Sequence, residues 1–72
     1  MIWRLPKLIS FPWGYDVKVI QGPSIEDDWG EYDPDTRTIY LTKSLPPAEK
    51  RGLLLHEIDH AYADWKLWAA QN

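Results

Sequence analysis

The last third of the sequence, from Ala48 to Gln71, contains no proline, and this run restricts the fold more than any other feature. Pro46 and Pro47 come directly before it. Proline is tolerated in the first turn of a helix, because its missing N–H would be unpaired there in any case. Apolar residues then recur at helical spacing and form one stripe, made of Leu54, Ile58, Ala61, Tyr62, Trp65, Trp68 and Ala69. The pattern predicts one long amphipathic helix.

Three β-rich segments precede this helix. Residues 15–20 alternate in part and are followed by Gln21, Gly22 and Pro23, which favour a strand end. Residues 29–32 and 38–42 flank the segment Asp33-Pro34-Asp35-Thr36, which has Asp first and Pro second, as in a type I turn. In the last segment, Ile39 and Leu41 share one face, which we expect to meet the core.

The first fifteen residues carry Pro6, Pro12 and the pair Trp13-Gly14, so we expect them to form an irregular arm. A chain of 72 residues has room for one small domain. The sequence therefore predicts an α+β fold over residues 1–72: a small antiparallel sheet of about three strands, packed on one long C-terminal helix.

Composition excludes several functional classes. The chain has no cysteine, so it has no disulfide framework, no Cys-based zinc finger and no thiol nucleophile. A net charge of −3 argues against a nucleic-acid partner that is bound through its phosphates. No apolar run approaches the roughly 20 residues of a membrane span, and the start lacks the pattern of a signal peptide. We expect a cytoplasmic protein that binds neither nucleic acid nor membrane.

The predicted helix contains the sequence His56-Glu57-Ile58-Asp59-His60, which is an H-E-x-x-H motif. Residues four apart lie one above the other on a helix, about 6 Å apart along its axis. Two imidazoles in this arrangement can converge on one Zn²⁺ ion. Glu57 is rotated by about 100° from His56, so its carboxylate can reach a water on the metal and act as general base. Both histidines of the chain belong to this motif.

The run from His56 to Trp65 resembles the active-site helix of thermolysin-type zincins, in which Ala follows the second His and an Asp and an aromatic residue come three residues later. The resemblance implies a zinc metallopeptidase that hydrolyses peptide bonds in a peptide or protein substrate. It implies His56 and His60 as zinc ligands and Glu57 as the catalytic base. The upstream hairpin resembles the wall of the zincin cleft, which implies an edge strand that pairs with the substrate backbone, made of Trp29, Gly30, Glu31 and Tyr32.

One departure from this family concerns the third zinc ligand. The family takes it from a Glu on a second helix roughly twenty residues beyond the second His, and the sequence ends at Asn72. Asp64 lies too far along the helix to join His56 and His60 on one ion, but at i+4 from His60 it can accept the other ring N–H of that residue as a supporting contact. Other candidate ligands are Glu31, Asp33, Asp35, the C-terminal carboxylate, a second subunit and water.

The sequence leaves two further questions open. Tyr32, Tyr40 and Arg37 are the candidates for stabilising the oxyanion of a peptidase reaction. The alternative to an enzyme is a non-catalytic, zincin-derived module for metal binding or interaction. It is favoured by the missing ligand and by the apolar helix end around Trp65 and Trp68, which predicts a partner surface or a homodimer. A purely structural zinc site is a weaker third reading, because such sites normally have four protein ligands.

Overall fold

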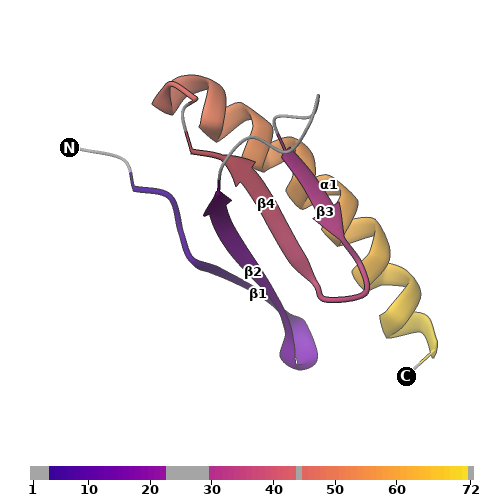
Figure 1. Ribbon diagram of the computed structural model, residues 1–72. Coiled ribbons are helices and arrows are strands. Elements are labelled where there is room, and N and C mark those ends of the chain that lie inside the picture. The colour runs from indigo at the N-terminus through magenta and orange to yellow at the C-terminus, as the bar shows by residue number, and fades with distance from the viewer. Residues whose placement is uncertain (1–3, 23–29, 44, 72) are drawn as a thin grey trace.

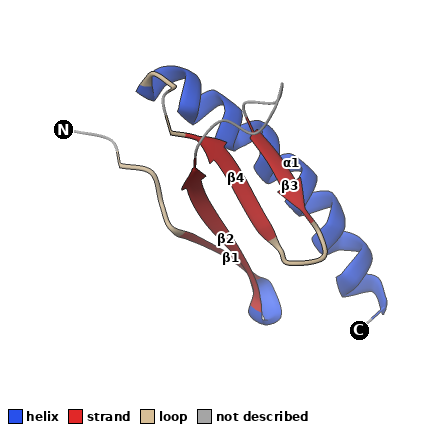
Figure 2. Ribbon diagram, in the orientation of Figure 1, coloured by secondary structure: helices blue, strands red, loops and turns tan. Residues whose placement is uncertain are grey.

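The structure is a computed structural model that describes residues 4–22, 30–43 and 45–71. Two strands, β1 (Leu8–Phe11) and β2 (Tyr15–Gly22), are joined by a short 3₁₀ turn at Pro12–Gly14. Strands β3 (Gly30–Asp33) and β4 (Thr38–Thr42) follow, and the long helix α1 (Pro47–Gln71) completes the chain. The helix lies across one face of the sheet (Figures 1 and 2). The predicted α+β class is confirmed.

The sheet has four strands in the order β1-β2-β4-β3, and it is mixed rather than antiparallel. β1 pairs with β2 and β3 pairs with β4 in antiparallel fashion, whereas β2 and β4 are parallel. The expectation of about three antiparallel strands is therefore corrected in both number and direction. β4 is a central strand, with β2 on one side and β3 on the other. It is buried along nearly its whole length, as expected for a strand with neighbours on both sides.

β1 is the strand that the sequence did not indicate. It has only four residues between Pro6 and Pro12, and only alternate residues are partly buried, as on an edge strand. The irregular element lies instead in the turn after it, where Trp13 adopts φ = 67° and Gly14 φ = 77°. A left-handed conformation is unfavourable for a residue with a bulky side chain. Contacts hold the turn: the Trp13 ring stacks on that of Trp65 at 5.7 Å, and Trp65 Nε1 donates to the carbonyl of Pro12 at 3.1 Å.

The core lies between the sheet and the helix. It combines alternate residues of β2, neighbours on β4 and two positions of α1: Tyr15, Val17, Val19, Ile39, Leu41, Leu54 and Ala61. Each fully buried aliphatic side chain contributes about 1.5–3 kcal/mol relative to an exposed one. Ile39 and Leu41 are completely buried, as their shared face predicted.

The helix is rotated relative to the predicted stripe. Its buried residues are Leu54, Glu57 and Ala61, whereas Tyr62 is 48% exposed. Ile58, Trp65 and Trp68 pack against the core but are only partly buried. The buried face of the helix therefore includes a glutamate, because the side that carries Glu57 is turned toward the sheet. No helix in the described part of the chain is long and apolar enough to cross a membrane.

The β3–β4 hairpin positions the edge of the sheet. The Asp33 carboxylate accepts the backbone N–H of Asp35 at 2.9 Å, which supports the predicted turn. Arg37 closes the turn with φ = 52°, and its guanidinium carbon lies 4.0 Å from the centre of the Tyr15 ring. A cation–π contact of this kind offsets part of the unfavourable backbone conformation. The hairpin leaves β3 at the edge of the sheet, beside α1 (Figure 1).

Candidate metal centre

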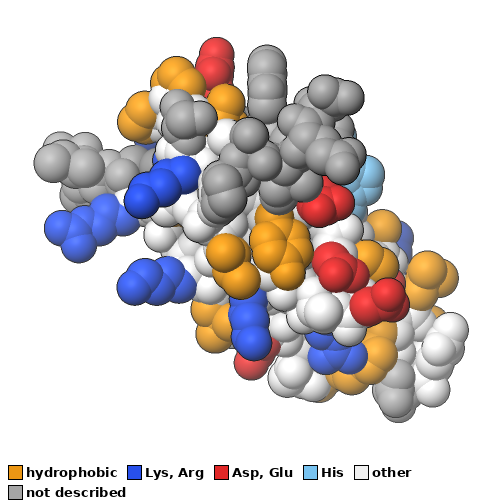
Figure 3. All heavy atoms as spheres, in the orientation of Figure 1, with side chains coloured by type: hydrophobic (Ala, Val, Ile, Leu, Met, Phe, Trp, Pro, Cys, Tyr) orange, Lys and Arg blue, Asp and Glu red, His pale blue; other side chains and the backbone are white. Residues whose placement is uncertain are grey.

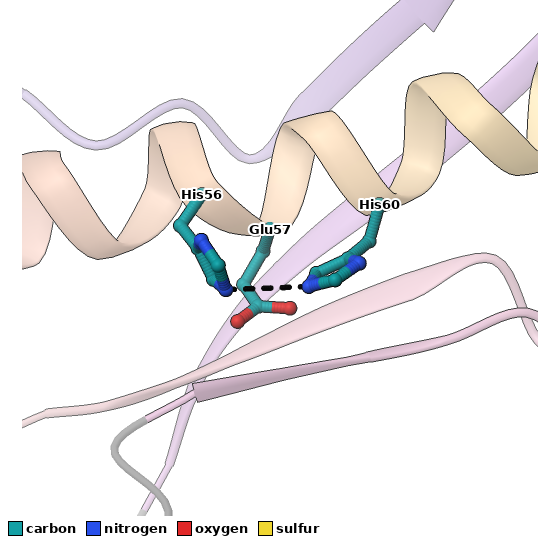
Figure 4. Close-up of side chains that lie close together, drawn as sticks. All are labelled: His56, Glu57 and His60. Carbon is teal, nitrogen blue, oxygen red and sulfur yellow. Dashed lines mark hydrogen bonds between the residues drawn. The ribbon is translucent and has the colours of Figure 1, made fainter.

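His56 and His60 project from the same side of α1 and converge at their tips. Their Nε2 atoms lie 3.2 Å apart, the rings are close to perpendicular, and both side chains are exposed (Figure 4). The helical spacing of four residues produces this arrangement, as the sequence predicted. Exposure leaves the facing nitrogens accessible to an ion from solvent.

The separation of the two nitrogens matches what one zinc ion requires. With Zn–N bonds of about 2.0–2.1 Å, tetrahedral geometry places two ligand nitrogens about 3.3 Å apart. The observed 3.2 Å corresponds to an N–Zn–N angle of about 103° for such bonds. The two rings therefore need little movement to hold one ion between them.

Glu57 completes a group of three potential ligand side chains. The donor atoms of His56, Glu57 and His60 all lie within 4.8 Å of one another. Glu57 is a buried residue, at 5% exposure, and its carboxylate lies beside the two ring tips (Figure 4). The carboxylate is therefore close enough to contact an ion held by the two histidines or a water bound to that ion. This group fits an H-E-x-x-H metal-binding arrangement.

An open cleft of about 490 Å³ borders this group, between α1 and the edge strand. Its lining combines residues of β3, the following turn and the helix: Glu31, Tyr32, Pro34, Glu57, His60, Ala63, Asp64 and Leu67. Three of these described residues carry carboxylates and none is Lys or Arg, which favours a cation in the cleft. Acidic side chains gather on the same side of the molecule as an exposed histidine (Figure 3).

The predicted substrate strand forms one wall of this cleft. Gly30, Glu31 and Tyr32 belong to β3, while Trp29 lies outside the described residues. Gly30 permits a close approach of β3 to the helix, because a Cβ atom there would lie 2.9 Å from Leu53 Cδ2. β3 pairs with β4 on one side, and its other edge borders no further strand among residues 4–22, 30–43 and 45–71.

Asp64 has hydrogen-bond partners that the sequence did not indicate. Its Oδ2 atom accepts from the hydroxyl of Tyr15 in a short hydrogen bond and from the hydroxyl of Tyr32 at 3.1 Å. The two hydroxyl oxygens are 3.0 Å apart. Asp64 thus ties α1 to β2 and β3, and its support of the His60 ring stays a prediction.

Burial governs the chemistry of the two tyrosines. Burial raises the pKa of Tyr15 and of Tyr32 above the usual value near 10, and the neighbouring Asp64 carboxylate adds to the increase at both residues. Both hydroxyls therefore stay protonated at neutral pH. The sequence indicates Tyr15 only as the start of a strand. Its alternation with Val17 was the available signal, since a buried tyrosine normally finds a partner for its hydroxyl.

The remaining candidates from the sequence, for stabilising the oxyanion and for the third metal ligand, lie apart from the His56-Glu57-His60 group of ligand atoms. Tyr40 lies between the two buried residues Ile39 and Leu41, so strand alternation places its side chain on the face away from the helix. Arg37 stacks on Tyr15, and its guanidinium is 5.4 Å from the centre of the Trp68 ring. Within the described residues, the cluster of potential ligand atoms includes none of Glu31, Asp33 and Asp35.

Comparison of the chain with protein-family models, with curated proteins and with solved structures gives no significant match. The site is therefore defined by its own geometry: a candidate metal-binding group, His56, Glu57 and His60, on a helix beside an acidic cleft.

Proposed function

We propose that this chain is a zinc-dependent peptidase in which His56 and His60 bind the ion and Glu57 is the general base. The observation that carries the proposal is the pair of exposed imidazole nitrogens 3.2 Å apart, with a carboxylate beside them. A peptide substrate would extend along β3 by strand addition, with its scissile carbonyl in the cleft. A third ligand from a partner, from the substrate or from water would complete the coordination sphere.

The residues divide the reaction between them. His56 and His60 would hold a zinc ion, which would act as a Lewis acid and lower the pKa of a coordinated water toward 7. Glu57 takes a proton as the water oxygen attacks the carbonyl carbon, and the C=O π electrons move to the carbonyl oxygen. The C=O bond then re-forms as the C–N bond breaks, and Glu57 returns the proton to the leaving amide nitrogen. Glu57 is buried and lines the cleft, so the surrounding residues limit the movement of its carboxylate.

Metal analysis and peptide cleavage test this proposal together. We expect the wild-type protein to bind one zinc and to cleave an unstructured peptide. Glu57→Gln should keep the zinc and lose about 10²–10⁴ in rate, which is the usual contribution of a general base. Asp59→Asn is the matched control, because Asp59 is an exposed carboxylate on the same helix. Absence of stoichiometric zinc in the wild-type protein would remove the hypothesis.

The second candidate function is a non-catalytic metal-binding or interaction module, which requires only the two histidines and no further ligand. Exposed apolar side chains on the helix favour it: Leu55 is 59% exposed and Leu67 65%. Trp65 and Trp68, expected at a partner surface, pack partly against the core. Zinc binding without Glu57-dependent cleavage, together with a dimer in light scattering, would support this alternative over the peptidase.

A further inference from the structure

Tyr32 is the one tyrosine that reaches the cleft of the metal group. It lies on β3, lines the cleft with Glu57 and His60, and is only partly buried. Tyr15, its hydrogen-bonded neighbour, is 1% exposed and lies behind it in the core. Of the two hydroxyls bound to Asp64, the Tyr32 hydroxyl is therefore the one that a molecule in the cleft can meet.

The hydrogen bonds of this cluster allow the Tyr32 proton to change partners. Asp64 Oδ2 accepts from both tyrosines, so it keeps one strong donor, Tyr15, when Tyr32 turns its O–H toward the cleft. An anionic oxygen in the cleft would replace Asp64 as acceptor, while the partly buried Asp64 carboxylate keeps its hydrogen bond from Tyr15. Without that second donor, the exchange would leave the carboxylate without a tyrosine partner, which is unfavourable for a charged group that is partly removed from water.

The spacing suits a substrate carbonyl. Asp64 is one helical turn beyond His60, which is about 6 Å along the axis. Tyr32, Glu57 and His60 line the same cleft, so a substrate carbonyl placed beside Glu57 and His60 shares that cleft with a hydroxyl that is held 3.1 Å from Asp64.

We propose that Tyr32 is a catalytic residue that donates a hydrogen bond to the oxyanion of the tetrahedral intermediate, with Asp64 and Tyr15 as positioning residues. The inference rests on the proposed peptidase function and assigns the electrophilic group that this function requires. The carbonyl oxygen gains the π electrons during attack by water, and the Tyr32 O–H stabilises that charge without transferring its proton.

Burial keeps this hydroxyl suited to the role. The pKa of Tyr32 is raised by burial first, and then by hydrogen bonds to Tyr15 and Asp64. The phenol consequently stays a neutral donor throughout the range in which a peptidase is assayed. The two partners also fix the ring before the substrate arrives, so little reorganisation accompanies the reaction.

Tyr32→Phe, Tyr15→Phe and Tyr40→Phe in the zinc-loaded protein test the assignment, because each removes one hydroxyl. We expect Tyr32→Phe to lower kcat by about 10²–10³-fold with little change in KM, as for loss of one oxyanion donor. Tyr15→Phe should lower kcat by a smaller factor. Without the Tyr15 hydroxyl, Asp64 retains its hydrogen bond from the Tyr32 O–H and competes with the oxyanion for it. Tyr40→Phe, on the opposite face of the sheet, should match the wild type. A phosphinic peptide, whose anionic oxygen resembles the oxyanion, should bind Tyr32→Phe more weakly by a similar factor.

The outcomes separate this inference from the proposed function. Normal kcat in Tyr32→Phe, alongside cleavage that still depends on Glu57, overturns the role of Tyr32 and leaves the peptidase standing. A Tyr32→Phe variant that loses zinc or shows only a lower Tm with unchanged kcat also overturns it, because that result indicates a structural role. Cleavage that does not depend on Glu57 removes the proposed function, and the assignment of Tyr32 with it.

Discussion

Zinc should stabilise the folded protein strongly, and both histidines should be needed for the effect. The 3.2 Å between the two Nε2 atoms would allow one ion to contact both rings. Binding to the native state alone adds about 2.7 kcal/mol at a free zinc concentration 100 times Kd. In a domain of this size, 1 kcal/mol shifts Tm by about 4–8 °C, so Tm should rise by roughly 11–22 °C.

A double-mutant cycle sharpens this prediction. His56→Ala and His60→Ala should each remove most of the zinc-induced shift, and the double variant should lose no more than either single variant, because both rings hold the same ion. Without zinc, the variants should unfold near the wild-type temperature, since both side chains are exposed. Thermal melts with zinc and with chelator, with Asp59→Asn as control, provide the measurement. Additive losses from the two substitutions would refute the shared-ion geometry.

Two further predictions concern stability. Because burial raises the pKa values of Tyr15 and Tyr32 in the folded state, their contribution to stability is present below the unfolded pKa near 10 and declines as the pH rises above it, where the unfolded chain ionises first. Melts between about pH 9 and about pH 11 should show a shallower decline in Tyr32→Phe than in the wild type; equal slopes would contradict this account. Gly30→Ala should destabilise by about 1–3 kcal/mol, because its Cβ would meet Leu53 and Leu41 at 2.9–3.0 Å. Gly52→Ala, in an open helical position, should instead stabilise by up to about 1 kcal/mol, and urea unfolding that ranks the two alike would argue against close β3–α1 packing.

Local signals were sufficient for the helix and its motif. The proline-free run, the apolar periodicity and the i, i+4 histidines act within a few residues of one another, so they indicate structure without knowledge of the rest of the chain. The same holds for the hairpin turn at Asp33 and for the inward face of Ile39 and Leu41. These predictions depend on backbone geometry alone, which is why the structure reproduces them.

Strand order and the rotation of the helix depend on packing between distant segments. The parallel β2–β4 pair and the short strand β1 follow from which surfaces cover one another, and no local pattern specifies that choice. Packing also turned Tyr62 outward and Glu57 inward, relative to the stripe read from the sequence. The periodicity of apolar residues specifies a broad face of the helix that can be buried. Packing against the sheet decides which residues lie at the centre of that face.

Spacing along the chain is enough to specify that two imidazoles and a carboxylate share one turn of a helix. The packing of the sheet on the helix sets what lies opposite them: an edge strand, an acidic cleft and the cluster of Tyr15, Tyr32 and Asp64. Tyr15 and Asp64 are 49 positions apart in the chain, and their hydrogen bond exists because the sheet and the helix bury the same face. Metal ligands can be encoded by local spacing, whereas the groups that surround a substrate have to be assembled by packing.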